Sequence, residues 1–262
     1  MEDRSDDAPP LTLFLTEPVR ALAELGLYFA ARPALPALPR GDGHPVLVLP
    51  GLLADDTSTR ALRAVLRRLG YAVHGWRLGR NVGPTAESVE GLRSCVSDLT
   101  HRHGRTVSLI GWSLGGIFAR EQAREMPRSV RQVITLASPF RLARPDQTRV
   151  HQAFQRYSHL HIRHPALPLE RDDGPLPVPA TSVYSHLDGI VAWETCLDTT
   201  GPRSENIAVL ASHLGIGHHP AAIYAVADRL AQAEGSWKPF QPPLALRPAF
   251  PRPDQPAAAV AA

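Results

Sequence analysis

Two kinds of segment alternate along the chain. Short apolar runs of four to six residues are typical of strands buried on both faces of a sheet. Segments between them have apolar residues three or four positions apart and predict helices. The predicted strands are 45–50, 71–76, 106–110, 133–136, 181–184 and 206–210. The predicted helices that accompany them are 58–69, 86–103, 114–126 and 221–231.

An additional helix is predicted ahead of the first strand, over about 16–31. Thr16 can cap it, and Pro18 suits its first turn. Leu22, Leu25 and Phe29 then share one face of this helix. Strands that alternate with helices at this spacing indicate an α/β chain with a mostly parallel sheet flanked by helices.

Three segments depart from this alternation. Residues 139–178 hold many Pro and His residues and no clear strand, which predicts a short lid-like insertion in a domain over 17–240. The N-terminal residues 1–16 and the Pro/Ala-rich residues 241–262 are predicted to be disordered tails.

Charge and cysteine content exclude several classes of function. The net charge is +3, and nearly all of the basic charge is arginine, since Lys238 is the only lysine. The densest run of basic residues lies on one predicted helix and indicates a solvated face, so no nucleic-acid partner is expected. Its members are Arg60, Arg63, Arg67 and Arg68. Cys95 and Cys196 form no CxxC pair, which argues against a disulfide framework and against a zinc site.

The beginning of the chain predicts neither a signal peptide nor a membrane span. Residues 1–10 are acidic and polar, unlike a secretory signal. The longest apolar stretch, 11–30, contains Glu17, Arg20 and Glu24, so stable membrane insertion is not expected. We therefore expect a cytoplasmic location.

The segment Gly111-Trp112-Ser113-Leu114-Gly115 matches the G-x-S-x-G nucleophile elbow. A predicted strand precedes it and a predicted helix follows it, which is the context that the motif requires. Glycine suits the first and last positions because side chains there would collide across the tight turn. Ser113 is therefore the predicted nucleophile.

A serine nucleophile needs a base, and the base needs an orienting acid. After such an elbow the acid comes next along the chain, and the histidine last. Asp188 directly follows a predicted strand and is the preferred acid. Asp172 and Asp173 are weaker candidates because no strand precedes them, and Asp198 is predicted to lie in a helix.

Three histidines follow the last predicted strand and compete for the role of base. His213 comes first, in a glycine-containing loop, and is preferred. His218 is the alternative. His219 precedes Pro220 and suits the start of the last helix.

Two backbone N–H groups are expected to form the oxyanion hole. One belongs to Leu114, directly after the nucleophile. The other belongs to Leu52, because Gly51 lets the chain turn after the first strand of the sheet. Arg80 and Asn81 follow the next strand, where a contact with substrate and a structural role are equally compatible with the sequence.

The insertion is rich in histidines, but no metal and no other cofactor is predicted. His151, His159, His161 and His164 lack a helix that would align them and have no cysteines nearby. The apolar residues of the insertion could cover an acyl pocket or pack on the edge of the sheet. These residues are Phe154, Tyr157, Leu160, Ile162 and Leu167.

Together, the elbow, Asp188 and His213 resemble the α/β-hydrolase superfamily. Residues 46–55, 75–84 and 212–218 resemble a group of its bacterial members that are described as esterases or lipases. This resemblance covers roughly residues 17–240 and implies the α/β-hydrolase fold, with a Ser-Asp-His triad that cleaves esters without metal or organic cofactor.

Two positions depart from the pattern of that superfamily. Pro50-Gly51 stands where many lipases have His-Gly, and His219 stands where the group has Asn. The sequence predicts a carboxylic-ester hydrolase that acts on a small-molecule ester with a hydrophobic acyl group. A thioesterase or acyltransferase with the same triad, and a binding protein without activity, are the alternatives.

Overall fold

The computed structural model describes residues 8–162, 174–198 and 201–254. Its centre is a six-stranded sheet in the order β2-β1-β3-β4-β5-β6, and all neighbouring strands are parallel. The strands are β1 (Pro45–Leu49), β2 (Ala72–Gly75), β3 (Val107–Trp112), β4 (Val130–Leu136), β5 (Ala180–Tyr184) and β6 (Ser204–Ala208). Each overlaps one predicted strand, so the predicted parallel sheet is confirmed.

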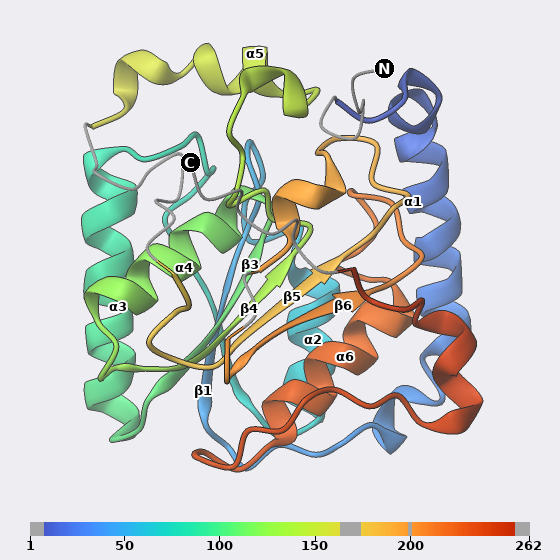
Figure 1. Ribbon diagram of the computed structural model, residues 1–262. Coiled ribbons are helices and arrows are strands. Elements are labelled where there is room, and N and C mark those ends of the chain that lie inside the picture. The colour runs from blue at the N-terminus through green and yellow to red at the C-terminus, as the bar shows by residue number, and fades with distance from the viewer. Residues whose placement is uncertain (1–7, 163–173, 199–200, 255–262) are drawn as a thin grey trace.

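Helices cover both faces of this sheet (Figure 1). Helices α3 (Ala86–His103) and α4 (Leu114–Glu125) pack on one face, and α2 (Arg60–Arg68) and α6 (Pro220–Ala231) pack on the other. The long helix α1 (Leu11–Ala31) lies along the outer edge of the molecule. The short helix α5 (His151–Gln155) lies in the insertion, beyond the carboxyl ends of the strands.

Short 3-10 helices occur in the connecting segments. They are Leu35–Ala37, Pro145–Gln147, Ser158–Leu160, Trp193–Cys196 and Leu244–Ala249.

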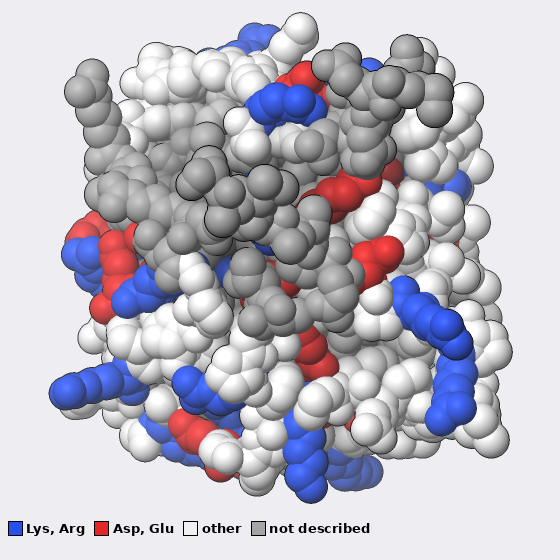
Figure 2. Space-filling model, in the orientation of Figure 1, with Lys and Arg blue, Asp and Glu red and all other residues white. Residues whose placement is uncertain are grey.

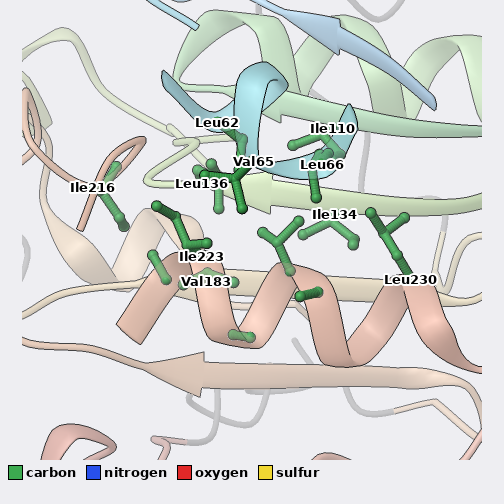
Figure 3. Close-up of a cluster of buried hydrophobic side chains, with 14 of the residues drawn as sticks. Leu62, Val65, Leu66, Ile110, Ile134, Leu136, Val183, Ile216, Ile223 and Leu230 are labelled. Atoms are coloured by element: carbon green, nitrogen blue, oxygen red, sulfur yellow. The ribbon is translucent and has the colours of Figure 1, made fainter. Parts of the chain in front are cut away.

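The apolar core has two layers, one on each side of the sheet. Figure 3 shows the layer in which Leu62, Val65 and Leu66 of α2 and Ile223 and Leu230 of α6 meet the sheet. The other layer lies under α3 and α4. Every residue of β1, β3 and β4 is buried, so these strands have no solvent-exposed face, which explains the unbroken apolar run of β1.

Helix α1 differs from its prediction in both its start and its buried face. It begins at Leu11, so the prediction of a disordered tail over 1–16 is wrong for residues 11–16. Thr16 lies inside the helix, where its hydroxyl donates to the carbonyl of Thr12. Leu22 and Phe29 share a face as predicted, but they are 69% and 55% exposed. The buried face instead holds Glu17 and Glu24, together with Tyr28.

The C-terminal segment differs from the predicted disordered tail over its described part. Residues 244–249 form a 3-10 helix, and the Phe250 ring packs against the rings of Tyr224 and Phe240. The backbone N–H of Asp254 donates to the Tyr184 hydroxyl. Aromatic contacts thus hold a segment whose Pro/Ala-rich composition had indicated disorder. The remaining tail residues, 1–7 and 255–262, lie outside the described part.

Basic and acidic side chains are interspersed on the face of the molecule shown in Figure 2. On α2, Arg60, Arg67 and Arg68 are exposed, as predicted for a solvated helix face, while Arg63 donates to the carbonyl of Asp56. Among the described helices, none is long and apolar enough to cross a membrane.

Candidate active site

Ser113 lies on the turn between β3 and α4. Its backbone has φ 52° and ψ −124°, a left-handed conformation that is strained for a residue with a side chain. The turn is held from both sides, since Ser113 N–H donates to Leu136 O at 2.8 Å and the Ser138 hydroxyl donates to Ser113 O at 2.6 Å.

The glycines of the elbow are required by close backbone contacts. A Cβ atom at Gly111 would overlap the backbone of Gly115 and Gly116, as the collision argument predicts. A Cβ atom at Gly115 would lie 2.6 Å from the carbonyl oxygen of Leu49 at the end of β1. The strained turn therefore fits only because both positions lack side chains.

Ser113 lines a cavity of about 290 Å³. The cavity lies between the first turn of α4, the loop after β1 and the described beginning of the insertion. Its apolar lining includes Leu52, Leu114, Ile117, Leu142, Val150, Phe154 and Val191. Arg144, His151 and Gln155 are among its polar lining residues. A mostly apolar cavity beside a serine hydroxyl suits an apolar ligand.

Asp188 and His213 are in direct contact. The imidazole Nδ1 of His213 lies 2.7 Å from Oδ2 of Asp188, and both residues are 4% exposed. The other carboxylate oxygen of Asp188 accepts the N–H groups of Ile190 and Val191, both at 2.8 Å. The carboxylate is thus fixed by the loop after β5 and orients the histidine in the loop after β6.

The surroundings of His213 favour its protonated form. Burial alone would lower the pKa of His213, but the charge and hydrogen bond of Asp188 and the charge of Glu17 act in the opposite direction and raise it above its ordinary value. An imidazolium formed at this position during a reaction would therefore be stabilised.

The structure brings the loop of His213 against the elbow. The indole N–H of Trp112 donates to the carbonyl of His213 at 3.1 Å, and a Cβ atom at Gly217 would lie 3.1 Å from the Trp112 ring. Between these described residues, the hydrogen bond from the Ser113 hydroxyl to His213 is not formed. Such bonds are often long in an enzyme without substrate and tighten when substrate binds.

The predicted oxyanion donors lie at the same cavity. The N–H groups of Leu52 and Leu114 have no acceptor within the described residues, and both residues line the cavity. Asn81 is fully buried, and its side-chain amide donates to Pro50 O at 2.9 Å, while Leu53 N–H donates to Asn81 O at 2.7 Å. Asn81 therefore has a structural role, because it holds the turn that presents Leu52.

The competing histidines have other partners. Nε2 of His218 lies 3.1 Å from the carbonyl oxygen of Ala21 on α1. His219 caps α6, where its ring nitrogen accepts from the N–H of Ala221 and Pro220 follows in the first turn, in agreement with the prediction.

Among the described residues, the alternative candidate for the acid does not contact His213. Asp198 follows a 3-10 helix instead of lying in a helix, and it forms a buried ion pair with Arg120 at 2.8 Å. Asp172 and Asp173 lie outside the described residues.

Two residues that the sequence interpretation had missed contact these loops. Glu17 and Glu24 of α1 are 1% and 8% exposed, and their carboxylates accept backbone N–H groups beside Asp188 and His213. In the sequence they served only as charges that argue against a membrane span. Their seven-residue spacing, which places both on one face of the helix, was the available signal.

The described part of the insertion packs around the cavity and the loop after β2. His161 directs Nε2 to the carbonyl of Val82 at 2.8 Å, and its ring lies against that of Phe154. Within the described residues, no group of three His, Cys, Asp or Glu side chains could hold a metal ion. His164 and Leu167 lie outside the described residues.

No family model and no curated protein sequence matches this chain. Solved structures do. Lipase B of Aspergillus fumigatus matches with a TM-score of 0.58 and 15% identity, over 74% of this chain and 53% of its own. MGS-MChE2, an α/β-hydrolase enzyme from a sediment metagenome of the lagoon of Mar Chica, Morocco, matches with a TM-score of 0.51 and 16% identity. This match covers 72% of this chain and 90% of that enzyme. The thioesterase domain from the curacin biosynthetic pathway matches with a TM-score of 0.51 and 14% identity, over 73% of this chain and 92% of that domain.

These matches, together with the parallel sheet and its helices, show that the chain has the α/β-hydrolase fold. The resemblance stated from the sequence is thereby confirmed for the fold. The match spans about half the length of the fungal lipase, so that lipase is a relative in fold only.

Proposed function

We propose that the protein is a serine hydrolase that cleaves carboxylic esters with a hydrophobic acyl group. The observation that carries the proposal is the placement of Ser113, on a strained elbow at the wall of an apolar cavity. The hydrogen-bonded pair of Asp188 and His213 on neighbouring loops supports it.

In the proposed reaction the acyl group occupies the apolar cavity and the carbonyl carbon lies next to Ser113. His213 takes the hydroxyl proton as Ser113 Oγ forms a bond to this carbon, and the N–H groups of Leu52 and Leu114 hold the oxyanion. The C–O bond to the alcohol then breaks, and His213 gives its proton to the leaving alcohol. Water, deprotonated by His213, then attacks the acyl carbon. The bond from this carbon to Ser113 Oγ breaks, His213 gives its proton to Oγ, and the acid is released.

The molecule contains a second Ser-His-Asp set, which shows that residue types alone are not sufficient to identify a catalytic serine. Nδ1 of His44 lies 2.5 Å from Asp42, and its Nε2 lies 2.9 Å from the hydroxyl of Ser108. His44 and Ser108 are 0% exposed, and Ser108 lies inside β3, between the neighbouring strands β1 and β4. No substrate can reach this serine, so Ser108 serves as an internal control for Ser113.

The test is hydrolysis of p-nitrophenyl esters over a range of acyl lengths by the wild type and matched variants. Ser113→Ala and His213→Ala should each lower kcat on the order of 10⁴-fold or more, since the groups of a triad act as a unit. Ser108→Ala and His218→Ala should keep their activity. A fluorophosphonate should label the wild type at Ser113 and leave Ser113→Ala unlabelled.

The proposal is contradicted if the wild type hydrolyses no ester and Ser113 is not labelled. Equal activity of Ser113→Ala and the wild type would contradict it as well. Acyl thioesters belong in the same panel, because the thioesterase domain is similar in fold and the same triad could attack a thioester carbonyl. A kcat/KM for thioesters well above that for oxygen esters would assign the chain to that class.

A further inference from the structure

Glu17 connects the two loops that carry Asp188 and His213. Its Oε1 accepts the N–H of Gly189 at 2.7 Å and the N–H of His213 at 3.0 Å. Its Oε2 accepts the N–H of Leu214 at 2.9 Å. One side chain from α1 thus binds the residue after the proposed acid, the proposed base itself and the residue after that base.

The contact between α1 and these loops is close on both sides. A Cβ atom at Gly189 would lie 2.5 Å from the carbonyl oxygen of Leu13, and one at Gly215 would overlap the carboxylate of Glu24. Arg20 adds a further contact to the first loop, because its guanidinium donates to Leu187 O at 2.7 Å and to Glu17 at 2.8 Å. The loops therefore meet α1 at glycines, where the backbone can approach the helix.

Glu24 makes a similar contact that reaches only one of the loops. Its Oε1 accepts the N–H of Ser212 at 2.7 Å, and its Oε2 accepts the hydroxyl of the same residue at 2.8 Å. Glu17 differs because it bridges both loops and contacts His213 directly. A buried carboxylate is costly unless it is paired or hydrogen-bonded, and Glu17 has three backbone donors and one guanidinium.

We propose that Glu17 is a positioning residue that holds the Asp188 loop and the His213 loop at the separation their hydrogen bond requires, with its negative charge beside the imidazole. This inference rests on the proposed function. It deepens that function by assigning part of the site to a helix that precedes the sheet in the chain and contributes no group to the cavity.

Two consequences follow for the reaction. Loss of the carboxylate would let the two loops separate, and a displacement of about 1 Å in an active site can lower the rate on the order of 100-fold. The charge on Glu17 is also one of the causes that raise the pKa of His213, so its removal should lower that pKa. The charged groups at this point are Asp188 and Glu17 beside His213, Arg20 beside Glu17, and Glu24 beside Ser212.

The experiment compares Glu17→Gln with the matched control Glu205→Gln. Glu205 is also a largely buried glutamate whose carboxylate accepts from an arginine and from a backbone N–H, but it lies near the start of β6, at the opposite end of the sheet. Leu22→Gln, at an exposed position of α1, controls for changes to the helix itself. Measurements are kcat and KM for one ester at several pH values, and thermal unfolding of each variant.

Glu17→Gln should lower kcat about 10- to 100-fold, with KM changed less than threefold, because the cavity walls come from other elements. The acid limb of its kcat/KM profile should move to lower pH than in the wild type. Glu205→Gln should unfold at a lower temperature but keep the wild-type kcat and pH profile, and Leu22→Gln should match the wild type in both respects.

A wild-type kcat and pH profile in folded Glu17→Gln would overturn the inference while leaving the proposed function intact. A wild type that neither hydrolyses esters nor reacts with a fluorophosphonate would instead remove the proposed function on which it rests. If Glu17→Gln does not fold, hydrogen exchange of the wild type decides. Slow exchange of the amides of Gly189, His213 and Leu214 supports the inference, and fast exchange overturns it.

Discussion

Two histidines of this protein have the same partner type and opposite pKa shifts. His213 and His44 each place Nδ1 against an aspartate. For His44 burial dominates, and together with the charge of Arg131 it lowers the pKa despite Asp42. For His213 the two carboxylates, Asp188 and Glu17, outweigh burial and raise the pKa. The balance between burial and all the surrounding charges, and not the His-Asp contact alone, sets the direction of the pKa shift.

The raised pKa of His213 gives a prediction for the pH dependence of activity. The base must be neutral to accept the serine proton, so kcat/KM should rise with pH, with a midpoint above the ordinary imidazole value of about 6.5. Asp188→Asn removes the largest favourable charge, so its midpoint should move to lower pH, and kcat should fall on the order of 10³- to 10⁴-fold. The measurement is kcat/KM for one ester between pH 5 and 9.

Asp42→Asn is a suitable control for this prediction, because it alters the other His-Asp contact at the far end of the sheet. Its kcat/KM profile should have the wild-type midpoint. An unchanged midpoint in Asp188→Asn would contradict the assignment of the acid limb to His213.

At the scale of elements, the sequence predicts helices well where local signals decide them. Helix α3 has the predicted bounds because Thr85 caps it, with its side chain accepting from Ser88 N–H, and Gly104 ends it with φ 59°. The elbow at Ser113 and the positions of Asp188 and His213 just beyond strand ends could also be predicted, because the motif and the strand ends are local in the sequence.

The role of α1 could not be predicted by the same means. A buried face with two glutamates is stable only because backbone N–H groups of distant loops meet it, and Glu17 is 196 positions away from His213 in the chain. A periodicity argument places the apolar residues inside instead. The order of the described C-terminal segment could not be predicted for the same reason. Phe250 packs against Tyr224 and Phe240, and these contacts exist only in the folded domain.

The insertion also gives a prediction at the scale of an element. Phe154 lies in α5, and Tyr157 lies two residues after the end of this helix. Of these two residues, only Phe154 lines the cavity. Phe154→Ala removes part of the apolar wall and should raise KM for long acyl chains about tenfold, from about 1.5 kcal/mol of lost burial. KM for an acetyl ester should change little, because a short acyl group does not extend to this wall.

Tyr157→Ala serves as the matched control, and its KM values should follow the wild type at every acyl length. The measurement is KM for p-nitrophenyl esters from acetyl to dodecanoyl. Equal KM values of Phe154→Ala and the wild type for all chain lengths would show that the acyl group does not occupy this cavity.

For the whole molecule, the parallel sheet separates two kinds of polar group. Three of these groups lie at the carboxyl ends of the strands. Ser113 lines the cavity, and Asp188 and His213 lie in the loops after β5 and β6. Near the amino end of β1, the buried residues His44 and Ser108 contact each other, and His44 also contacts the exposed Asp42. The fold thus places Ser113 at the wall of a cavity, whereas Ser108 and His44 lie inside the domain.

Four buried or half-buried histidines contribute to the pH dependence of stability in the neutral range. Burial is the largest cause that lowers the pKa of His44, His74 and His219, while the pKa of His213 is raised. A lowered folded-state pKa means that the unfolded chain binds more protons below about pH 6.5, so stability falls as pH falls through that value. The contribution of His213 has the opposite sign, since it is present at low pH and lost as pH rises through its raised pKa.

Because three groups oppose one, we expect the unfolding temperature to decrease from pH 7.5 to pH 5.5. The measurement is thermal unfolding over this range, below which carboxylates begin to contribute. His74→Gln should weaken the decrease, since Nε2 of His74 is buried without a hydrogen-bond partner within the described residues, and the variant loses one proton site but no such bond. An unfolding temperature that rises on acidification would show that the carboxylates around His213 dominate the pH dependence of the whole domain.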